Sequence, residues 1–557
     1  MLGFKRPEAL PLRKPADLAI PSRETDVAHW SDASPRRAPI SLAVLLIAGC
    51  LVVIGLCARV APLLDPEGRG LRQFPTEDGY LMLTVARNLA LGLGMSTAAG
   101  EIPTNGVQPL ATFVYAAGFR AVNGDRVAGV LVAQWLQVAL ACGAGVLLWR
   151  VARRLLGSMP GAESVAVLSA ALWFAAPNTV RNSLNCLETG AYALVLIGFC
   201  LFALRRLPPG ERWPLGACAL AGAWIALAFW VRNDAVLLAG AFCAQRLIAG
   251  WRGAGIDLRG ALVETVTIGG SATALALPWV VHNWLRFGYA MPISGVAESA
   301  GSRFGENLPY LPAALAEYLA PPLQIPLAWE LRAPVIGLSL LLVGAWLAAA
   351  WAVRQQASAQ ARQWLDVFLL WTLALCGFYG LAFGAHHFVN RYVFALSPLL
   401  AIGSVAFAAR AATALPLGRT LALGAAALAT LGAAALNLRG YRGGMEHMHF
   451  QVVEWVADHV PDDTWVAAIQ TGTLGFFHDR TLNLDGKVNP RALEARLAGR
   501  TQEYVLESPV EYLVDWTGIA AWAKGTALEG RFEIIELDAQ RNLAVLRRIE
   551  ATPAHGG

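Results

Sequence analysis

Charged residues are scarce in this sequence. Asp, Glu, Lys and Arg make up 15% of its 557 residues, whereas a soluble globular domain carries about a quarter. Hydrophobic residues account for 56%, and the mean hydropathy is +0.48. The apolar residues gather in runs of about 20, the length that crosses a bilayer. These features exclude an ordinary soluble domain and predict a polytopic α-helical membrane protein. The small net charge of +5 comes without a basic cluster, so we expect no nucleic-acid partner.

The sequence also lacks cysteines spaced for metal binding. Its eight cysteines show no CxxC pattern and lie in or beside apolar segments, so we interpret them as small buried hydrophobic residues. A cleavable secretion signal is missing too. Residues 1–39 are polar, basic and rich in proline, and no small-residue cleavage site precedes the first apolar run. We therefore expect residues 1–39 to form a disordered cytoplasmic tail ahead of an uncleaved first span.

Long apolar runs are abundant and predict about eleven membrane spans. These cover about residues 40–62, 127–149, 162–180, 189–206, 214–231, 234–250, 260–281, 334–353, 364–385, 391–409 and 418–437. The apolar segment 108–122 is shorter and predicts a re-entrant or interfacial helix.

Arginines are unevenly distributed among the short loops. Alternate loops carry two or three each, whereas the opposite loops carry one each, at Arg181, Arg232 and Arg391. The positive-inside rule then places the N-terminus and the arginine-rich loops in the cytoplasm. An odd number of spans leaves the C-terminal segment outside, which in a bacterium is the periplasmic side of the cytoplasmic membrane.

This topology predicts two external loops and an external domain. The transmembrane domain covers 40–437, with external loops at 63–126 and 282–333, and the tail covers 438–557. In the tail, short β-like runs such as WVAAI and EYLVDW alternate with helical patterns such as FQVVEWVADHV. This alternation predicts a small periplasmic α/β domain.

Two adjacent acids follow the first span, in the stretch EDGYLMLTVARNLALGLG at 77–94. Thr76 is placed to cap a helix whose positive end favours Glu77 and Asp78. Polar and apolar residues separate onto two faces, which predicts an amphipathic helix at the membrane interface. One interpretation is that the acids only begin this helix; the other is that they are the working end of an enzyme.

Other ionisable residues also stand at external span ends. They are Glu188, Arg232, Asp234, His282, Arg286, His386, His387 and Arg391. Charges at a membrane edge are costly and usually face a cavity or a partner. A set of both signs on one face suits a site that deprotonates one group and neutralises an anionic leaving group.

Several motifs, in order along residues 40 to 490, resemble the GT-C glycosyltransferase superfamily. They are EDGYLMLTVARNLALGLG, PTNGVQPL, LETGAYALVL, the RND turn, FGYAMPISG, NRYVFALSP and NLDGKVN. This superfamily includes bacterial relatives of protein mannosyltransferases and of lipid A aminoarabinose transferases. The resemblance implies a polyprenyl-phosphate-linked sugar as donor, in the lipid bilayer. It also implies transfer to an acceptor hydroxyl of a glycan, lipid or protein on the periplasmic face, with inversion.

The resemblance further implies roles for particular residues. An acid of the opening pair, Asp78 or Glu77, is the expected catalytic base. The phosphate of such a donor needs positive charge, for which Arg391 and Arg87 are the first candidates and Arg232 and Arg286 the second. The substrates are expected to contact polar residues of the external segments: Tyr80, Thr104, Asn105, Gln108, Glu188, Asp234, His387 and Asp485.

The chain departs from the family pattern TNGxHPLW at two positions. Gln108 stands where relatives have His, and Ala111 where they have Trp. These departures leave open a different substrate or a non-catalytic scaffold.

Two further alternatives stay open. A divalent cation, Mg²⁺ or Mn²⁺, suits neighbouring carboxylates, although adjacent acids on a helix diverge. A transporter or flippase for lipid-linked glycans is the other class, but such proteins place their polar groups near the bilayer midplane.

Overall fold

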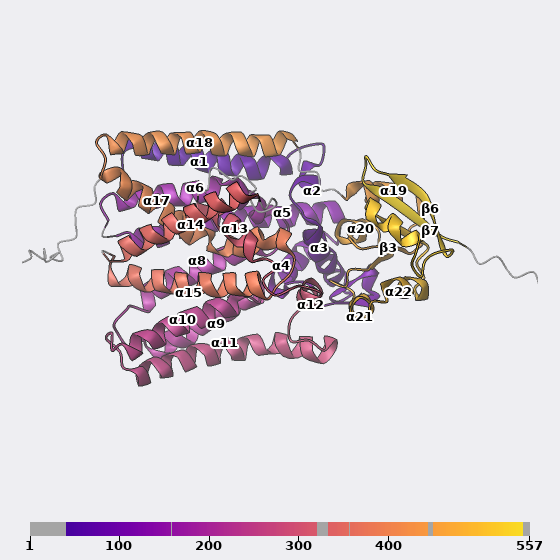
Figure 1. Ribbon diagram of the computed structural model, residues 1–557, viewed down its shortest axis with the longest axis horizontal. Coiled ribbons are helices and arrows are strands. Elements are labelled where there is room, and N and C mark those ends of the chain that lie inside the picture. The colour runs from indigo at the N-terminus through magenta and orange to yellow at the C-terminus, as the bar shows by residue number, and fades with distance from the viewer. Residues whose placement is uncertain (1–39, 158, 320–331, 356, 444–448, 550–557) are drawn as a thin grey trace, which may run out of the picture. The chain divides into compact units, whose positions relative to one another are not determined.

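The computed structural model describes residues 40–157, 159–319, 332–355, 357–443 and 449–549. The expected tail 1–39 and part of the predicted loop 282–333 lie outside the described residues. Figure 1 shows long helices running side by side, with the β-sheet of the C-terminal region beyond one end of them.

Each predicted span corresponds to an apolar helix, and the polytopic class is confirmed. Eight described helical segments are long and apolar enough to cross a bilayer. These are α1 with its 3₁₀ extension (Leu42–Leu63), α5 (Arg126–Leu155), α8 (Thr189–Arg206), α11 (Leu258–Phe287), α14 (Ala333–Arg354), α15 (Ala359–Leu381), the composite His386–Thr413 and α18 (Gly418–Gly443). Three apolar helices are shorter: α6 (Ala162–Ala175), α9 (Leu215–Val231) and α10 (Ala235–Trp251).

The span predicted at 162–180 is broken in two. Helix α6 ends at Ala175, and α7 (Pro177–Leu184) begins at a proline. Ala176 has extended backbone angles, as expected for a residue before proline. The 14 residues of α6 span only about 21 Å. As a result α7, which carries Asn178, Arg181 and Asn182, is a separate polar helix.

The span predicted at 391–409 begins irregularly. The 3₁₀ turn η5 (His386–Phe388), α16 (Val389–Val393) and the 3₁₀ turn η6 (Phe394–Leu396) precede α17 (Ser397–Thr413). Arg391 lies in the short helix α16, and its side chain reaches the polar region described below.

The loop 63–126, predicted to be external, folds into short elements. They are α2 (Arg69–Gln73), α3 (Glu77–Ala90), β1 (Ser96–Thr97), the 3₁₀ turn η2 (Ala98–Gly100), β2 (Ile102–Pro103) and α4 (Pro109–Ala121). The predicted cap forms, because the Thr76 hydroxyl accepts a 3.1 Å bond from the Gly79 N–H. The second external loop supplies α12 (Ile293–Ser299), the 3₁₀ turn η3 (Leu308–Tyr310) and α13 (Leu311–Leu319).

The amphipathic character predicted for α3 does not leave a polar face in water. Tyr80, Thr84 and Asn88 are all buried. The Tyr80 ring packs against Phe450 and Phe476 of the C-terminal region. The polar face of α3 is therefore an internal contact surface, since a domain distant in sequence covers it.

The C-terminal region is a small α/β domain with a mixed sheet. Its helices are α19 (Phe450–His459), α20 (Gly472–Phe477), α21 (Pro490–Leu497) and α22 (Thr501–Glu507), with the 3₁₀ segment η7 (Thr517–Ala523). Its strands are β3 (Val466–Ala468), β4 (Thr481–Asn483), β5 (Tyr512–Asp515), β6 (Phe532–Asp538) and β7 (Leu543–Arg548). The strand order is β4-β3-β5-β7-β6; β3 runs parallel to β4 and β5, and the remaining pairs are antiparallel. Strand β4 was not predicted from the sequence, and it leads directly into the NLDGKVN segment.

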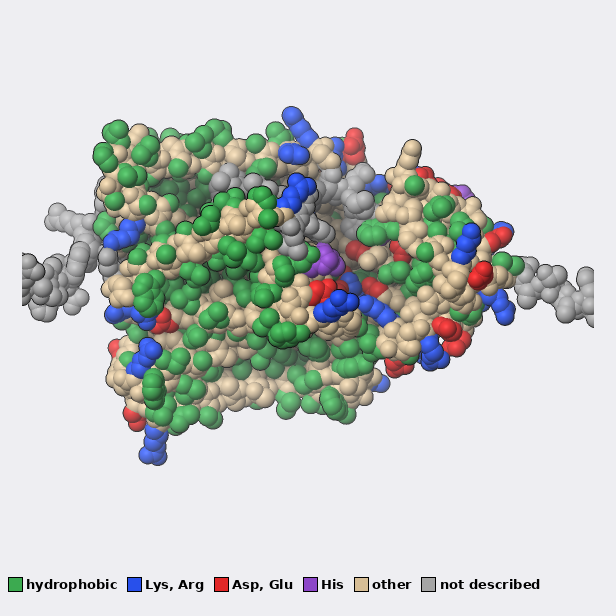
Figure 2. Space-filling view, in the orientation of Figure 1, with side chains coloured by type: hydrophobic (Ala, Val, Ile, Leu, Met, Phe, Trp, Pro, Cys, Tyr) green, Lys and Arg blue, Asp and Glu red, His purple; other side chains and the backbone are tan. Residues whose placement is uncertain are grey.

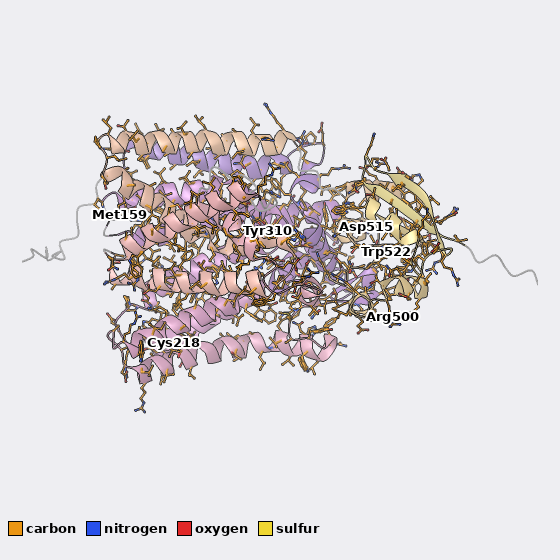
Figure 3. All side chains as sticks on the ribbon, viewed as in Figure 1. Met159, Cys218, Tyr310, Arg500, Asp515 and Trp522 are labelled. Carbon is orange, nitrogen blue, oxygen red and sulfur yellow. The ribbon has the colours of Figure 1, made fainter. Side chains whose placement is uncertain are left out.

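The C-terminal domain lies at one end of the helical region and is absent from the opposite end, as far as the described residues show. Met159, in the turn after α5, and Cys218, near the start of α9, lie at the end remote from Asp515 of the sheet (Figure 3). Figure 2 shows mostly hydrophobic side chains along the helices, with Lys and Arg side chains towards the ends. Near the remote end, Arg246 pairs with Glu264 at 2.6 Å and Arg354 with Asp366 at 2.7 Å. These acids therefore have structural partners.

Candidate active site

The two acids at the start of α3 face different surroundings. Consecutive residues of a helix diverge by about 100°. The Glu77 carboxylate accepts hydrogen bonds from the Gly472 N–H, from the Thr473 N–H at 3.1 Å and from the Thr473 hydroxyl at 2.6 Å. The first N–H groups of a helix and its dipole favour an anion. Glu77 therefore joins α3 to the start of α20.

Gly472 is required for this approach. A Cβ at position 472 would lie 1.8 Å from the Glu77 carbonyl oxygen, so only glycine allows the two backbones to come this close. The first N–H groups of α20, whose sequence is GTLGFF, thus bind a carboxylate of the protein itself.

Asp78 contacts two cations from distant parts of the chain. Its Oδ2 lies 2.8 Å from Arg391 Nη1, and its Oδ1 lies 3.4 Å from Lys487 Nζ. Burial alone raises the pKa of Asp78, but the charges of Lys487 and Arg391 outweigh it and hold the pKa well below its usual value. Asp78 is therefore a carboxylate at any ordinary pH.

Lys487 comes from the loop after β4 and was not predicted as a site residue. Its Nζ also lies 2.6 Å from Glu298 and 3.9 Å from Asp485. Burial opposes its charge, but Asp78, Asp485 and Glu298 together raise the pKa of Lys487. Burial raises the pKa of Asp485, whose carboxylate accepts a 2.8 Å bond from the Lys487 N–H. The only sequence signal was the presence of this lysine within NLDGKVN.

The TNG motif of the first external loop supports Lys487. A Cβ on Gly106 would lie 1.8 Å from the Lys487 carbonyl oxygen, so the two loops touch through their backbones. Thr104 accepts a 3.0 Å bond from the Gly106 N–H. The Asn105 amide donates to Asn283 at 3.0 Å. Thr104 and Asn105 thus shape the loops rather than line the cavity.

A second ionic cluster lies nearby around Arg232. Its guanidinium contacts Glu188 at 2.6 Å and Asp234 at 2.9 Å, and the Tyr379 hydroxyl donates to Asp234 at 2.7 Å. Glu188, Arg232 and Asp234 are buried. Among the described residues, the Oδ1 of Asp234 has no hydrogen-bond partner.

The two clusters line one cavity of about 270 Å³. Its charged walls are Asp78, Glu188, Arg232, Asp234, Glu298, Arg391 and Lys487. Its apolar walls include Leu81, Met82, Val107, Leu187, Met291 and Phe378. Gln108 also lines it, with a buried Oε1 that has no partner among the described residues. The cavity therefore matches a ligand that combines an anionic group with apolar and hydroxylated parts.

Other residues named from the sequence lie outside this cavity. Arg87 pairs with Asp479 at 3.3 Å and donates to the Gly124 carbonyl at 2.9 Å. Arg286 is exposed. The Tyr80 hydroxyl donates to the Leu71 carbonyl at 2.6 Å.

His387 lines a neighbouring cavity. This neighbouring cavity also includes Asp78 in its wall, whereas Arg87, Arg286 and Tyr80 line neither cavity.

The acids do not fit a divalent cation in this arrangement. Asp78 is already neutralised by Arg391 and Lys487, and Glu77 by backbone N–H groups. No cluster of three or more His, Cys, Asp or Glu with suitable geometry occurs among the described residues. Hard cations need several free oxygen ligands, and the carboxylates of Asp78 and Glu77 are already engaged by other groups of the protein.

The fold is similar to those of two solved membrane proteins, ArnT and AglB. ArnT from Cupriavidus metallidurans, in its structure with undecaprenyl phosphate, aligns with a TM-score of 0.54 at 13% identity, covering 91% of this chain and 98% of that chain. The oligosaccharyltransferase AglB from Archaeoglobus fulgidus, in complex with an inhibitory peptide and a dolichol-phosphate, aligns with a TM-score of 0.52 at 12% identity. That alignment covers 86% of this chain and 69% of AglB.

The sequence comparisons are sparser. The family described as "Domain of unknown function (DUF8728)" matches residues 437–547, which contain the α/β domain. Comparison with curated proteins finds no match.

Proposed function

We propose that the protein is a membrane glycosyltransferase that moves a sugar from a polyprenyl-phosphate-linked donor to an acceptor hydroxyl. The contact of Asp78 with Arg391 and Lys487, on the wall of a partly apolar cavity, carries this proposal. Asp78 provides the carboxylate base, and Arg391 and Lys487 provide two cations for a phosphate. The GT-C fold adds support, because the structures of ArnT and AglB were obtained with undecaprenyl phosphate and with a dolichol-phosphate.

The chemistry is a single displacement at the anomeric carbon. The acceptor oxygen forms a bond to that carbon, and its proton passes to Asp78. The bond between the anomeric carbon and the phosphate oxygen breaks, and its electron pair stays on the phosphate, where Arg391 and Lys487 balance the charge. A displacement with one base inverts the anomeric centre, whereas retention needs a second carboxylate as nucleophile. Glu77 is held by α20 and is not that nucleophile.

Donor binding activates the base in this mechanism. A carboxylate whose pKa is far below the operating pH is a weak general base. The donor phosphate competes with Asp78 for Arg391 and Lys487, so the pKa of Asp78 rises when the donor binds. The enzyme thus keeps Asp78 unreactive until a phosphate is in place.

The Arg232 cluster holds the sugar. Asp234 and Gln108 line the same cavity, and their carboxylate and carboxamide oxygens can accept hydrogen bonds from sugar hydroxyls. Arg232 forms ion pairs with both Asp234 and Glu188 and so fixes the position of Asp234 on the cavity wall. Gln108, where relatives have His, contributes a neutral hydrogen-bonding group.

The site lies on the periplasmic side of a bacterial cytoplasmic membrane in this proposal, with the arginine-rich turns in the cytoplasm. Arg154 and Lys524 are exposed and suit cysteine labelling. A membrane-impermeant thiol reagent applied to intact spheroplasts should label Lys524→Cys and not Arg154→Cys. The reverse pattern would place the site on the cytoplasmic side and refute the topology.

Substrate trapping tests the function. Asp78→Asn keeps both cations but cannot take the acceptor proton, so the variant should retain its donor during purification. Native mass spectrometry should detect a polyprenyl phosphate carrying one sugar on Asp78→Asn, and none on Asp78→Asn/Arg391→Gln. Absence of any prenyl phosphate species from both variants and from the wild type would overturn the proposal.

A further inference from the structure

A second cavity meets the first at Asp78. It has a volume of about 330 Å³ and shares only Asp78, Arg391 and Lys487 with the first cavity. Its remaining walls come from the segment before α3, from α7, from the end of α13, from η5 and from Gln470. The carboxylate of Asp78 is therefore accessible from two separate spaces.

The two cavities differ in wall chemistry. Leucine, valine, methionine and phenylalanine side chains make up much of the first wall. The apolar residues of the second wall are Phe74, Pro75 and Phe388, without leucine, isoleucine, valine or methionine among the described residues. Its carboxamides are Gln73, Asn178, Asn182, Asn185, Asn390 and Gln470. Carboxamides both donate and accept hydrogen bonds, as hydroxyl groups do. A dense carboxamide lining suits a hydroxyl-rich ligand and not a prenyl chain.

Part of this lining is already held rigid. The amides of Asn178 and Asn390 donate to Glu317 at 3.2 and 3.5 Å. The Asn182 amide donates to the Asn178 carbonyl at 2.9 Å. The buried Oε1 of Gln73 has no hydrogen-bond partner among the described residues. The cavity thus combines a fixed polar frame with an acceptor atom that a ligand can satisfy.

Arg181 adds a positive charge to this cavity. Its side chain lines the cavity and forms no ion pair or hydrogen bond with the described residues, although its charge interacts with Glu317 of the same wall. Glu317 also accepts hydrogen bonds from the amides of Asn178 and Asn390. A guanidinium with free donors binds carboxylate or phosphate through paired hydrogen bonds.

We infer that the second cavity is the acceptor site and takes a saccharide that bears an anionic group, which Arg181 binds. The acceptor hydroxyl reaches Asp78 from this cavity and attacks the anomeric carbon held in the first. This inference rests on the proposed function and gives the acceptor its chemical class. A carboxylate or a phosphate provides the same recognition, and composition analysis of the acceptor distinguishes them.

The first test identifies the acceptor in cells. Envelope fractions of cells that express only Asp78→Asn should accumulate one anionic glycan lacking a sugar that the wild type adds. The glycan should bind an anion exchanger and survive protease treatment. A change confined to a protein or to an uncharged lipid would overturn the acceptor inference and leave the proposed function standing. No change in any envelope molecule would count against the proposed function itself.

The second test assigns the role of Arg181. With that glycan as acceptor, Arg181→Gln should raise its KM by about 10- to 100-fold and leave kcat nearly unchanged, since one charged hydrogen-bond partner is lost. Its affinity for undecaprenyl phosphate should match the wild type, which also shows that the variant is folded. The exposed Arg286→Gln is the matched control and should leave KM unchanged. An unchanged KM in Arg181→Gln would overturn the recognition of an anionic group.

Discussion

The carboxylate of Asp78 lies 2.8 Å from the guanidinium of Arg391, although 313 residues separate them in the chain. Lys487 lies still later in the chain, and its Nζ is 3.4 Å from the other oxygen of the same carboxylate. One acid of the first external loop is thereby balanced by a cation from a late span and another from the C-terminal domain. This three-way contact joins the membrane domain, the loop and the tail at one point.

Asp78→Asn should reduce sugar transfer by about 10²- to 10⁴-fold, because general-base assistance is lost. The same variant should bind undecaprenyl phosphate more tightly than the wild type, since Arg391 and Lys487 no longer face a competing carboxylate. Transfer assays with the trapped donor and native mass spectrometry with undecaprenyl phosphate measure the two effects. Weaker phosphate binding in Asp78→Asn would contradict the idea that Asp78 and the phosphate compete for Arg391 and Lys487.

Arg391→Gln should weaken binding of undecaprenyl phosphate by about 10- to 100-fold, the range for loss of a charged hydrogen bond. Arg286→Gln should leave the affinity unchanged, since Arg286 is exposed outside the cavity. Titration in nanodiscs followed by intrinsic tryptophan fluorescence provides the measurement. Equal losses in both variants would indicate a general charge effect and not a phosphate site.

Lys487→Gln should raise the pKa of Asp78 by about 1 to 3 pH units and so bring an acid limb into the kcat/KM profile that the wild type lacks in mild acid. In the free wild type the pKa of Asp78 is well below normal, so this carboxylate stays ionised in mild acid and produces no acid limb there. Removing the charge of Lys487 lets burial raise that pKa, and protonation then removes the base as the pH falls. A profile identical to the wild type would show that Lys487 does not control Asp78.

The same ion pairs have a consequence for stability. A carboxylate with a lowered native pKa stabilises the fold at pH values above its unfolded pKa, and this contribution is lost as the pH falls through the native pKa. The melting temperature of Lys487→Gln should therefore be lower than that of the wild type at pH 7. The difference should shrink in strong acid.

Gly472→Ala should loosen the contact between α3 and α20, because the added Cβ cannot fit 1.8 Å from the Glu77 carbonyl oxygen. Gly475→Ala in the same helix is the matched control, since its Cβ would lie 3.7 Å from Thr481. Limited proteolysis should release the C-terminal domain faster in Gly472→Ala than in the wild type. Gly475→Ala should resist as well as the wild type, and equal sensitivity of the two variants would refute the close-approach argument.

Local patterns predicted the helices of this protein well. Hydropathy is a property of consecutive residues, so each predicted span has a matching helix. The break at Pro177 was visible in the sequence as a proline, but its effect on 162–180 was not predicted. The strand β4 was missed because its sequence, TLN, holds one apolar residue between two polar ones and gives no apolar run like the WVAAI that revealed β3.

The candidate site was predictable only in part. Asp78, Glu188, Arg232, Asp234 and Arg391 stood out as charges at external span ends, and the structure brings them to one cavity. The same criterion also selected Arg286, which the structure leaves exposed. A charge at a span end indicates that a partner is needed, but it does not say which partner is present.

The sequence by itself determined the membrane class, the number of apolar helices and the cap of α3, because each depends on neighbouring residues and their hydration. Only the tertiary structure decided that Glu77 binds α20 while Asp78 faces two cavities, and that Lys487 belongs to the site. These outcomes depend on contacts between segments separated by hundreds of residues. Their energies come from packing and charge pairing in space, which no local pattern records.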